Sequence, residues 1–281
     1  WEAAVMLLPP EEVPGVIARY DGRPERFDWA RQFLGLEDRA PYCLGKSQSL
    51  QHGAVIFNGV GGVDLGRRDP ALREEVLAKL GQADWIGVRD RATLALLAAA
   101  GVSARLMPDP AVLTRVLFGE RIRARAEAGE PAAVRADFPQ GYVAVQVAAS
   151  LGDDATLSTI AAGLARLAKE KGVVFFRAGA APWHDDLDVC RRAAALLPGT
   201  RIFESIDIWD ICALIASSAG FAGSSLHGRI VAEACGVPVA EGVVPIGPKV
   251  AAYRQTWRGD DAVAAYRAAW ADMLKATFGN T

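Results

Sequence analysis

Short apolar runs alternate with amphipathic stretches along most of the chain, in two separate blocks. In residues 53–113, three apolar runs predict strands, and two stretches with apolar residues three and four apart predict helices. The expected strands are 54–57, 85–88 and 105–107, and the expected helices are 70–80 and 91–100. Strands that alternate with helices over short connections indicate a parallel sheet with helices packed on it.

The second block, residues 140–240, follows the same pattern without repeating the sequence. Strands are expected at 142–148, 173–176, 201–203 and 220–222 and after Gly236, and helices within 157–172, 185–197, 208–215 and 226–235. We therefore predict an α/β fold with two Rossmann-like, doubly wound domains and a cleft between them. In such sheets, ligands bind beyond the carboxyl ends of the strands.

Two segments interrupt the alternation. Residues 1–50 contain five prolines and are predicted to be irregular apart from a short helix at 28–34. Residues 118–139 are charged and small, so a linker with a loose helix is expected there. The predicted domains are 1–117 and 140–281, the second ending in a helix at 261–278 that packs back on either domain. Because the chain starts at Trp1 rather than Met, we expect the N-terminal domain to be incomplete at its start.

Composition excludes several classes of protein. With 51% hydrophobic and 23% charged residues the chain can form a full core, and a net charge of −2 argues against a nucleic-acid-binding protein. The four cysteines are far apart and form no CxxC pair, which predicts buried free thiols and fits a cytoplasmic protein. No apolar run reaches the length of a transmembrane helix, and no signal-peptide pattern is present.

The candidate chemistry is concentrated in residues 217–240. A short strand leads into the turn Gly223-Ser224-Ser225 and then into a helix, with His227 at the junction. A strand, a small-residue turn and a helix N-terminus aim backbone N–H groups at one point, which suits a phosphate or a carboxylate. His227 beside it could transfer a proton. The alternative is a Ser-capped helix with a hydrogen-bonded histidine in its first turn.

In the first block, the candidates again follow predicted strands. Residues 58–62 are rich in glycine and could let the backbone approach a ligand, or could form a tight turn; the spacing does not match GxGxxG. Arg89 precedes Asp90, which is expected to cap a helix. Asp109 lies between two prolines and either caps a turn or faces the cleft.

In the second block, Gln146, Arg177 and Lys249 also come after predicted strands. Residues 184–186, His-Asp-Asp, could ligate a metal, but adjacent carboxylates at the start of a helix favour capping, so no metal is expected. Glu233 could reach a sugar hydroxyl or lie on the surface. The chain has no P-loop and no GxSxG motif, which argues against those classes of enzyme.

Taken together and in order, several of these segments resemble the polysaccharide pyruvyl transferase family. The resemblance covers about residues 53–255 and includes the glycine segment 58–62 and the His-Asp-Asp segment. Its main parts are Trp85-Ile86-Gly87-Val88-Arg89-Asp90-Arg91-Ala92-Thr93, Asp109-Pro110-Ala111, Gly223-Ser224-Ser225-Leu226-His227-Gly228 with Gly236-Val237-Pro238, and Lys249.

The resemblance implies a GT-B-like fold and the transfer of a pyruvyl group from phosphoenolpyruvate to two hydroxyls of a sugar in a cell-surface or secreted glycan. It implies phosphoenolpyruvate as the donor substrate and no metal or other cofactor. His227 is carried over as the acid/base residue. The expected donor-binding residues are Ser224, Ser225, Leu226, Gly228, Arg229, Lys249, Arg177 and Gln146. The expected acceptor-binding residues are Asn58, Gly59, Gly61, Gly62, Arg89 and Asp109.

Two positions depart from the family pattern. Many members have arginine where this chain has Ser225 and where it has Gln146, and Arg177 or Arg229 could substitute. One alternative, of the same architecture, is a GT-B-type nucleotide-sugar glycosyltransferase, with a diphosphate at Ser224 and a ribose at Glu233. A second is a non-catalytic glycan- or protein-binding member. The expected partner is a sugar or lipid-linked glycan, with peripheral association with membrane glycan machinery and an oligomer both compatible with the sequence.

Overall fold

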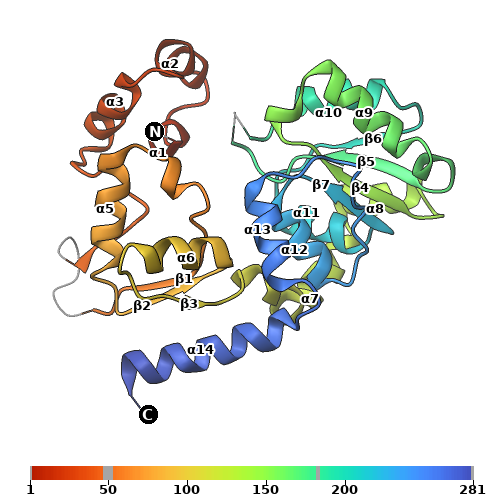
Figure 1. Ribbon diagram of the computed structural model, residues 1–281. Helices are drawn as coiled ribbons and strands as arrows, with labels where there is room; N and C mark the ends of the chain where they lie inside the picture. The colour runs from red at the N-terminus through yellow and green to blue at the C-terminus, as the bar shows by residue number, and fades with distance from the viewer. Residues whose placement is uncertain (1, 47–52, 182–183, 280–281) are drawn as a thin grey trace. The chain divides into compact units, whose positions relative to one another are not determined.

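The chain is described by a computed structural model that covers residues 2–46, 53–181 and 184–279. It divides into two compact units (Figure 1). Unit 1 consists of residues 1–106 and 269–281, and unit 2 of residues 107–268. Each unit contains a parallel sheet with helices, which confirms the predicted α/β class.

Unit 1 is built on a three-stranded parallel sheet. Its strands are β1 (Ile56–Val60), β2 (Trp85–Val88) and β3 (Arg105–Leu106), in the order β1-β2-β3. The connections carry η1 (Leu65–Arg67), α5 (Pro70–Leu80) and α6 (Arg91–Ala99). Asp90 caps α6 as predicted, since its carboxylate accepts a 2.7 Å hydrogen bond from the Thr93 amide. A small apolar core of Leu80, Ile86, Val88 and Leu97 joins the sheet to these helices.

The N-terminal region differs from the prediction. Its described residues include the helices α1 (Glu2–Met6), α2 (Val13–Tyr20) and α3 (Glu25–Leu34), where only the last was expected. Two of the prolines were taken as signs of irregular chain but lie at helix starts: Pro14 is in the first turn of α2, and Pro24 is the N-cap of α3. A proline lacks only an N–H that would have no partner there.

Strand β1 is longer than predicted. Asn58 and Gly59, expected in a turn, lie within the strand, which continues to Val60. Phe57 pairs with Ile86 and Val60 with Val88, so β1 contains one extra residue. Gly59 has φ of +62°, a conformation that glycine adopts without strain, and accommodates this bulge.

Unit 2 is built on a four-stranded parallel sheet in the order β6-β5-β4-β7. The first two strands, β4 and β5, are adjacent; β6 extends the sheet on one side and β7 on the other, so the winding reverses between β4 and β7. Such a reversal is where doubly wound sheets bind ligands. The strands are β4 (Tyr142–Gln146), β5 (Gly172–Phe176), β6 (Arg201–Phe203) and β7 (Gly220–Gly223).

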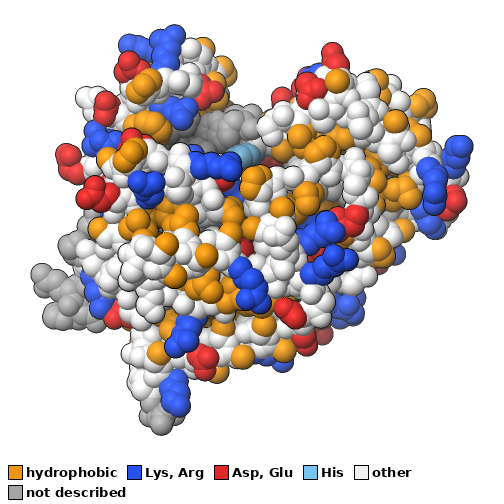
Figure 2. Space-filling model, viewed as in Figure 1, with side chains coloured by type: hydrophobic (Ala, Val, Ile, Leu, Met, Phe, Trp, Pro, Cys, Tyr) orange, Lys and Arg blue, Asp and Glu red, His pale blue; other side chains and the backbone are white. Residues whose placement is uncertain are grey.

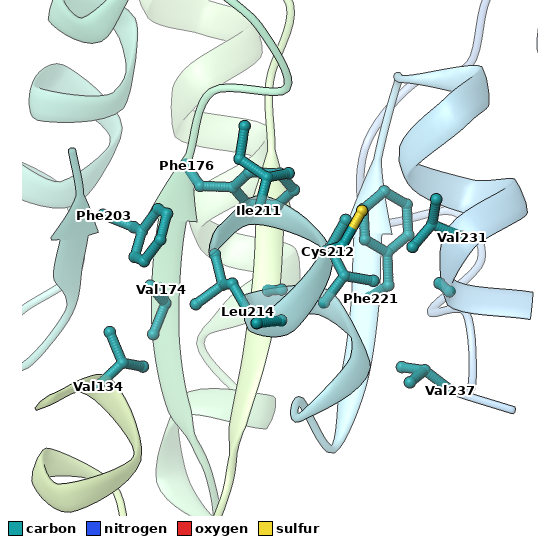
Figure 3. Close-up of a cluster of buried hydrophobic side chains, with 14 of the residues drawn as sticks. Val134, Val174, Phe176, Phe203, Ile211, Cys212, Leu214, Phe221, Val231 and Val237 are labelled. Carbon is teal, nitrogen blue, oxygen red and sulfur yellow. The ribbon is translucent and has the colours of Figure 1, made fainter. Parts of the chain in front are cut away.

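Helices cover both faces of this sheet. Alternate strand residues point to opposite faces: Val174 and Phe176 belong to one buried cluster, whereas Val173 and Phe175 belong to another. Figure 3 shows the first cluster, where α11 lies against the sheet. The helices are α9 (Asp154–Leu164), α10 (Leu187–Ala195), α11 (Ile208–Ala216), α12 (Leu226–Ala234) and α13 (Pro248–Trp257), with short 3-10 turns η2 (Pro110–Leu113), η3 (Ala149–Leu151) and η4 (Leu167–Lys169).

The segment predicted as a linker forms part of unit 2 instead. It folds into α7 (Thr114–Ala126) and α8 (Gly129–Asp137), whose residues Ile122, Ala126 and Val134 are buried in the core. Polar and aromatic side chains add to this attachment: Arg125 binds Asp210, and Phe118 contacts Trp209. The division between units falls after residue 106, not at 117. The last helix, α14 (Ala262–Phe278), is divided between the two units.

The surface carries charges of both signs. On the face shown in Figure 2, blue and red side chains are interspersed. This agrees with the small net charge of −2. Across the described part of the chain, no helix combines the length and the apolar character needed to cross a membrane.

Candidate functional site

The candidate site lies in unit 2, at the carboxyl ends of β4 and β7. Gln146 ends β4, Gly223 ends β7, and the chain then turns through Ser224 and Ser225 into α12. Because the two strands are neighbours and parallel, their ends lie at the same edge of the sheet. The sequence prediction that this turn follows a strand and begins a helix is confirmed.

Two glycines let the turn lie close to the sheet. A Cβ on Gly223 would lie 2.7 Å from the ring of Phe221, and one on Gly228 would lie 2.9 Å from the same ring. Phe221 is fully buried, so its ring cannot move aside. Gly228 therefore has a packing role that brings the first turn of α12 down onto β7.

Gln146 organises the turn. Its side chain is 3% exposed, and its Oε1 accepts hydrogen bonds from the Ser225 amide at 2.8 Å and from the Ser224 hydroxyl at 3.1 Å. The Ser224 amide donates to the Gln146 carbonyl at 3.4 Å. The amides of Ser224 and Ser225, which the sequence analysis assigned to a bound anion, are thus already occupied by Gln146.

Both serine hydroxyls are also engaged within the protein. Ser224 Oγ accepts from the Ala148 amide at 3.1 Å. Ser225 is the N-cap of α12, and its Oγ accepts from the Gly228 amide at 3.2 Å. The expectation of a Ser-capped helix is therefore correct for Ser225. The first-turn amides that remain are those of Leu226 and His227, for which we find no hydrogen-bond partner among the described residues.

His227 projects from this first turn and is paired with a carboxylate. Its side chain is 67% exposed, and its Nε2 lies 3.3 Å from Oδ2 of Asp109, whose side chain is 5% exposed. The other oxygen of Asp109 accepts from the Ala111 amide at 3.0 Å, which fixes the carboxylate at the start of η2. Since η2 packs against α12, a buried, fixed carboxylate orients an exposed imidazole.

This pairing was not predicted. Asp109 was assigned to acceptor binding in the N-terminal domain, whereas it belongs to unit 2 and contacts His227. Its capping of a turn was one of the expected alternatives and is confirmed. The two residues are 118 positions apart in sequence, and only the packing of η2 on α12 brings them together.

Arg229 is buried and neutralised locally. Its guanidinium makes two 2.9 Å contacts with the carboxylate of Glu241 and one of 3.3 Å with Glu233. Burial raises the pKa of Glu233, although Arg229 opposes the shift. These contacts tie α12 to residue 241, so Arg229 stabilises the helix that carries His227 rather than offering its charge to an anion.

The other donor-site candidates lie on neighbouring elements of unit 2. Arg177 follows β5, is half-buried and donates to the Glu204 carbonyl at 3.2 Å. Lys249 is exposed in the first turn of α13. His184 is exposed, and Asp186 caps α10 as the sequence analysis favoured. Within the described residues, no cluster of His, Cys, Asp and Glu is arranged to hold a metal ion.

The remaining candidates form a compact network in unit 1. A Cβ on Gly61 would lie 2.5 Å from Nε of Arg89, so the guanidinium packs directly on this glycine. The Gly62 amide donates to Thr93 Oγ1 at 2.8 Å, and that hydroxyl donates to Asp90 at 3.0 Å. Gly61 and Gly62 therefore close against Arg89 and the start of α6, whereas Asn58 and Gly59 lie in strand β1 and not in a turn. Acceptor binding by these residues stays a prediction.

In this unit His227 lies at the reversal of strand order, which is where doubly wound sheets bind their ligands. The model of the family "Polysaccharide pyruvyl transferase" matches residues 42–241. The chain therefore belongs to the polysaccharide pyruvyl transferase family. A comparison with curated proteins gives no match.

Two solved structures are similar over part of their length. One is UDP-GlcNAc 2-epimerase from Neisseria meningitidis bound to UDP-GlcNAc, with 14% identity and a TM-score of 0.43 over 66% of this chain and 50% of that chain. The other is the S. aureus MnaA–UDP co-structure, with 12% identity and a TM-score of 0.45 over 80% of this chain and 61% of that one. This chain thus spans less than two thirds of either protein.

Proposed function

We propose that this protein transfers a pyruvyl group from phosphoenolpyruvate to two hydroxyls of a sugar in a glycan or a lipid-linked glycan. Membership of the pyruvyl transferase family supports the class of reaction. The observation that carries the proposal is the pair of His227 and Asp109, at 3.3 Å, beside the first turn of α12. An exposed imidazole oriented by a buried carboxylate is suited to proton transfer.

The reaction needs one proton at carbon. When C3 of the enolpyruvyl group takes up a proton, C2 becomes electrophilic and the first sugar hydroxyl adds to it. The bond from C2 to the phosphate oxygen then breaks, the electron pair leaves with phosphate, and the second hydroxyl adds to C2 to close the ketal. Of the two hydroxyl protons released, one balances the proton gained by C3, and the other leaves with phosphate.

His227 is assigned the proton at C3. Since Nε2 faces Asp109, Nδ1 is the nitrogen that would deliver the proton to the substrate. The carboxylate 3.3 Å away orients the imidazole for this transfer. The first-turn amides of Leu226 and His227, at the positive end of α12, would hold an oxyanion of the donor next to the imidazole.

A transfer assay tests the proposal. The full chain is incubated with phosphoenolpyruvate and a panel of lipid-linked and free glycans, and phosphate release and the ketal methyl signal in proton NMR are followed. We expect His227→Ala to lower turnover by about 10²- to 10⁴-fold, the range for loss of a general acid–base group. His184→Ala is the matched control, because His184 is an exposed histidine of the same unit, and it should keep full activity.

Two outcomes would contradict the proposal. One is turnover by His227→Ala at the wild-type rate. The other is stabilisation against heat by UDP or UDP-sugars with none by phosphoenolpyruvate, because a ligand raises the melting temperature of the protein that binds it. The second outcome would favour the nucleotide-sugar glycosyltransferase considered from the sequence.

A further inference from the structure

A cavity of about 280 Å³ lies in unit 1, between α3 and the start of α5 (both at the left in Figure 1). Its volume lies just below the range of about 300–1,000 Å³ of pockets for drug-sized ligands, so a single sugar ring fits it better than a longer ligand. Of the residues that line it, all but Asp69 and Leu72 precede residue 42, where the family match begins. The cavity is therefore formed mostly by a part of the chain outside the matched region.

One wall of the cavity, residues 38–41, is held in place by buried charges. Glu75 accepts hydrogen bonds from the amides of residues 39 and 40, at 3.0 and 3.1 Å. Lys79 is 7% exposed, and its Nζ lies 2.8 Å from Oε1 of Glu75 and 3.3 Å from Oδ2 of Asp38. The same Nζ donates to the Ala40 carbonyl at 3.2 Å. A segment without a helix or strand of its own is thus fixed in advance, which lowers the entropic cost of binding a ligand.

Two arginines offer hydrogen-bond donors to this cavity. The guanidinium of Arg39 has no hydrogen-bond or ion-pair partner among the described residues. Arg31 contacts Asp28 through Nη2 at 2.6 Å, whereas its Nε is buried and has no partner in the described part of the chain. A buried N–H without a partner has lost its hydration, and an oxygen of a ligand would replace the missing bond.

Three carboxylates line the same cavity, those of Asp28, Asp38 and Asp69. Asp69 caps α5 with one oxygen, which accepts from the Leu72 amide at 3.1 Å. Three carboxylates against two guanidinium groups do not favour an anion, and the unpaired guanidinium of Arg39 does not favour a cation. Donors and acceptors side by side suit hydroxyl groups, since a hydroxyl both donates and accepts.

Apolar side chains complete the lining. Phe27 is 38% exposed, and the guanidinium of Arg26 lies over its ring at 4.8 Å. Pro24, Leu34 and Pro41 add aliphatic surface. A sugar ring presents C–H groups on its faces and hydroxyls around its edge, which matches a mostly apolar lining with a few polar groups.

We propose that this cavity binds one neutral sugar unit of the acceptor glycan, with Arg31 and Arg39 donating to its hydroxyls and Asp69 accepting from them. This rests on the proposed function, in which a sugar accepts the pyruvyl group. It makes the segment that precedes residue 42 a determinant of acceptor specificity.

Binding of simple glycosides to the full chain tests this. The probes are methyl glucoside, methyl galactoside and methyl mannoside, each with the matching methyl glycuronide as its anionic counterpart, and saturation-transfer NMR measures their affinities. Arg39→Ala removes the unpaired guanidinium and keeps the amide that binds Glu75. Arg105→Ala is the matched control, because Arg105 is an exposed arginine of the same unit, on β3 and outside the cavity. Thermal unfolding shows that both variants fold.

We expect the wild type to bind at least one neutral glycoside, and to bind its glycuronide more weakly. Arg39→Ala should bind this glycoside about 10-fold more weakly, as expected when a charged donor is lost, and Arg105→Ala should bind it as the wild type does. In transfer assays, Arg39→Ala should raise KM for the glycan and leave KM for phosphoenolpyruvate unchanged. In the ¹⁵N-labelled wild type, the Nε–H signal of Arg39 should move when the glycoside is added.

Four results would overturn the inference: no neutral glycoside bound by the wild type, equal affinity in the two alanine variants, tighter binding of the glycuronide, or an unmoved Arg39 signal at saturation. Failure here is distinguishable from failure of the proposed function. An unchanged KM for the glycan in an Arg39→Ala variant that transfers pyruvyl groups would reject the sugar site alone. Glycoside binding that depends on Arg39, without any transfer activity, would leave the sugar site in place and reject the reaction.

Discussion

At the scale of single residues, Asp109 gives His227 a defined orientation. Its two oxygens have different partners: Oδ1 accepts from the Ala111 amide at 3.0 Å, and Oδ2 faces the imidazole at 3.3 Å. One carboxylate thus caps η2 and orients a histidine on α12. Asp109 is therefore a positioning residue for the proposed acid, His227. A conservative substitution can remove this positioning role while keeping the cap of η2.

Asp109→Asn is expected to lower turnover by at least about 10-fold with little change in melting temperature. Asparagine keeps the oxygen that caps η2, but it puts an NH₂ group in front of Nε2 and so favours the other imidazole tautomer. The measurement is the transfer rate, together with ¹⁵N NMR of the imidazole, which reports the tautomer. A rate equal to the wild type, with an unchanged tautomer, would show that Asp109 does not position His227.

The sequence singled out His227 because a strand, a small-residue turn and a helix start make a recognisable pattern. It could not single out the Asp109–His227 pair or the orientation of Gln146. Both depend on contacts between residues 118 and 79 positions apart, which no local pattern encodes. Arg229 was predicted to bind the donor, and its pairing with Glu241, 12 positions away, was not predicted.

At the scale of elements, the start of α12 is set by contact with β7. Gly228→Ala places a Cβ 2.9 Å from the buried Phe221 ring, and we expect a loss of about 1–3 kcal/mol, the range for overpacking a core. This exceeds the gain of about 1 kcal/mol that alanine offers over glycine in a helix. Gly247→Ala is the control, because nothing lies within 4 Å of the Cβ position there. Chemical denaturation measures both, and equal stability of the two variants would contradict the account.

Helix α7 is attached to α11 by the contact of Arg125 with the carboxylate of Asp210. Asp210 is 5% exposed; it accepts a 3.2 Å hydrogen bond and a second, shorter one from Arg125, and one of 2.7 Å from Ser205. Burial alone would raise the pKa of Asp210, but the bonds from Arg125 and Ser205 outweigh it and the pKa is lowered from 3.8. Because the pKa is lower in the folded state, the ionised carboxylate stabilises the folded protein at pH values above the pKa that Asp210 has in the unfolded chain.

Asp210→Asn is therefore expected to lower the melting temperature at pH 7, and the difference from the wild type should shrink as the pH falls below the ordinary value of 3.8. Asp154→Asn, which breaks an exposed pair with Arg192, is the control and should change little at either pH. Melting curves from pH 7 to pH 3 measure this. A difference that persists undiminished at pH 3 would be inconsistent with a charged Asp210.

The strands and the main helices were predictable because their apolar spacing is regular. Helix α8 was not, since Val134 and Pro131 are its only buried residues and the surrounding residues are small or charged. The N-terminal helices were missed because prolines at helix starts have the same sequence signature as prolines in loops.

At the scale of the whole molecule, two parallel sheets follow from two blocks of alternating strands and helices. The boundary between the two units could not be predicted from this alternation. The chain passes from β3 directly into Asp109 and η2, which belong to unit 2. This shift moves Asp109 from the predicted acceptor domain to the unit that carries His227. The cleft predicted between the domains stays a prediction.

The most direct test of the central claim is a crystal structure of the protein with phosphoenolpyruvate bound, with a parallel soak in UDP. The account predicts phosphoenolpyruvate at the start of α12, with C3 facing the imidazole of His227 and an oxyanion of the donor at the amides of Leu226 and His227. Phosphoenolpyruvate bound away from His227, or UDP in its place at the first turn of α12, would contradict the claim that this turn is the pyruvyl donor site.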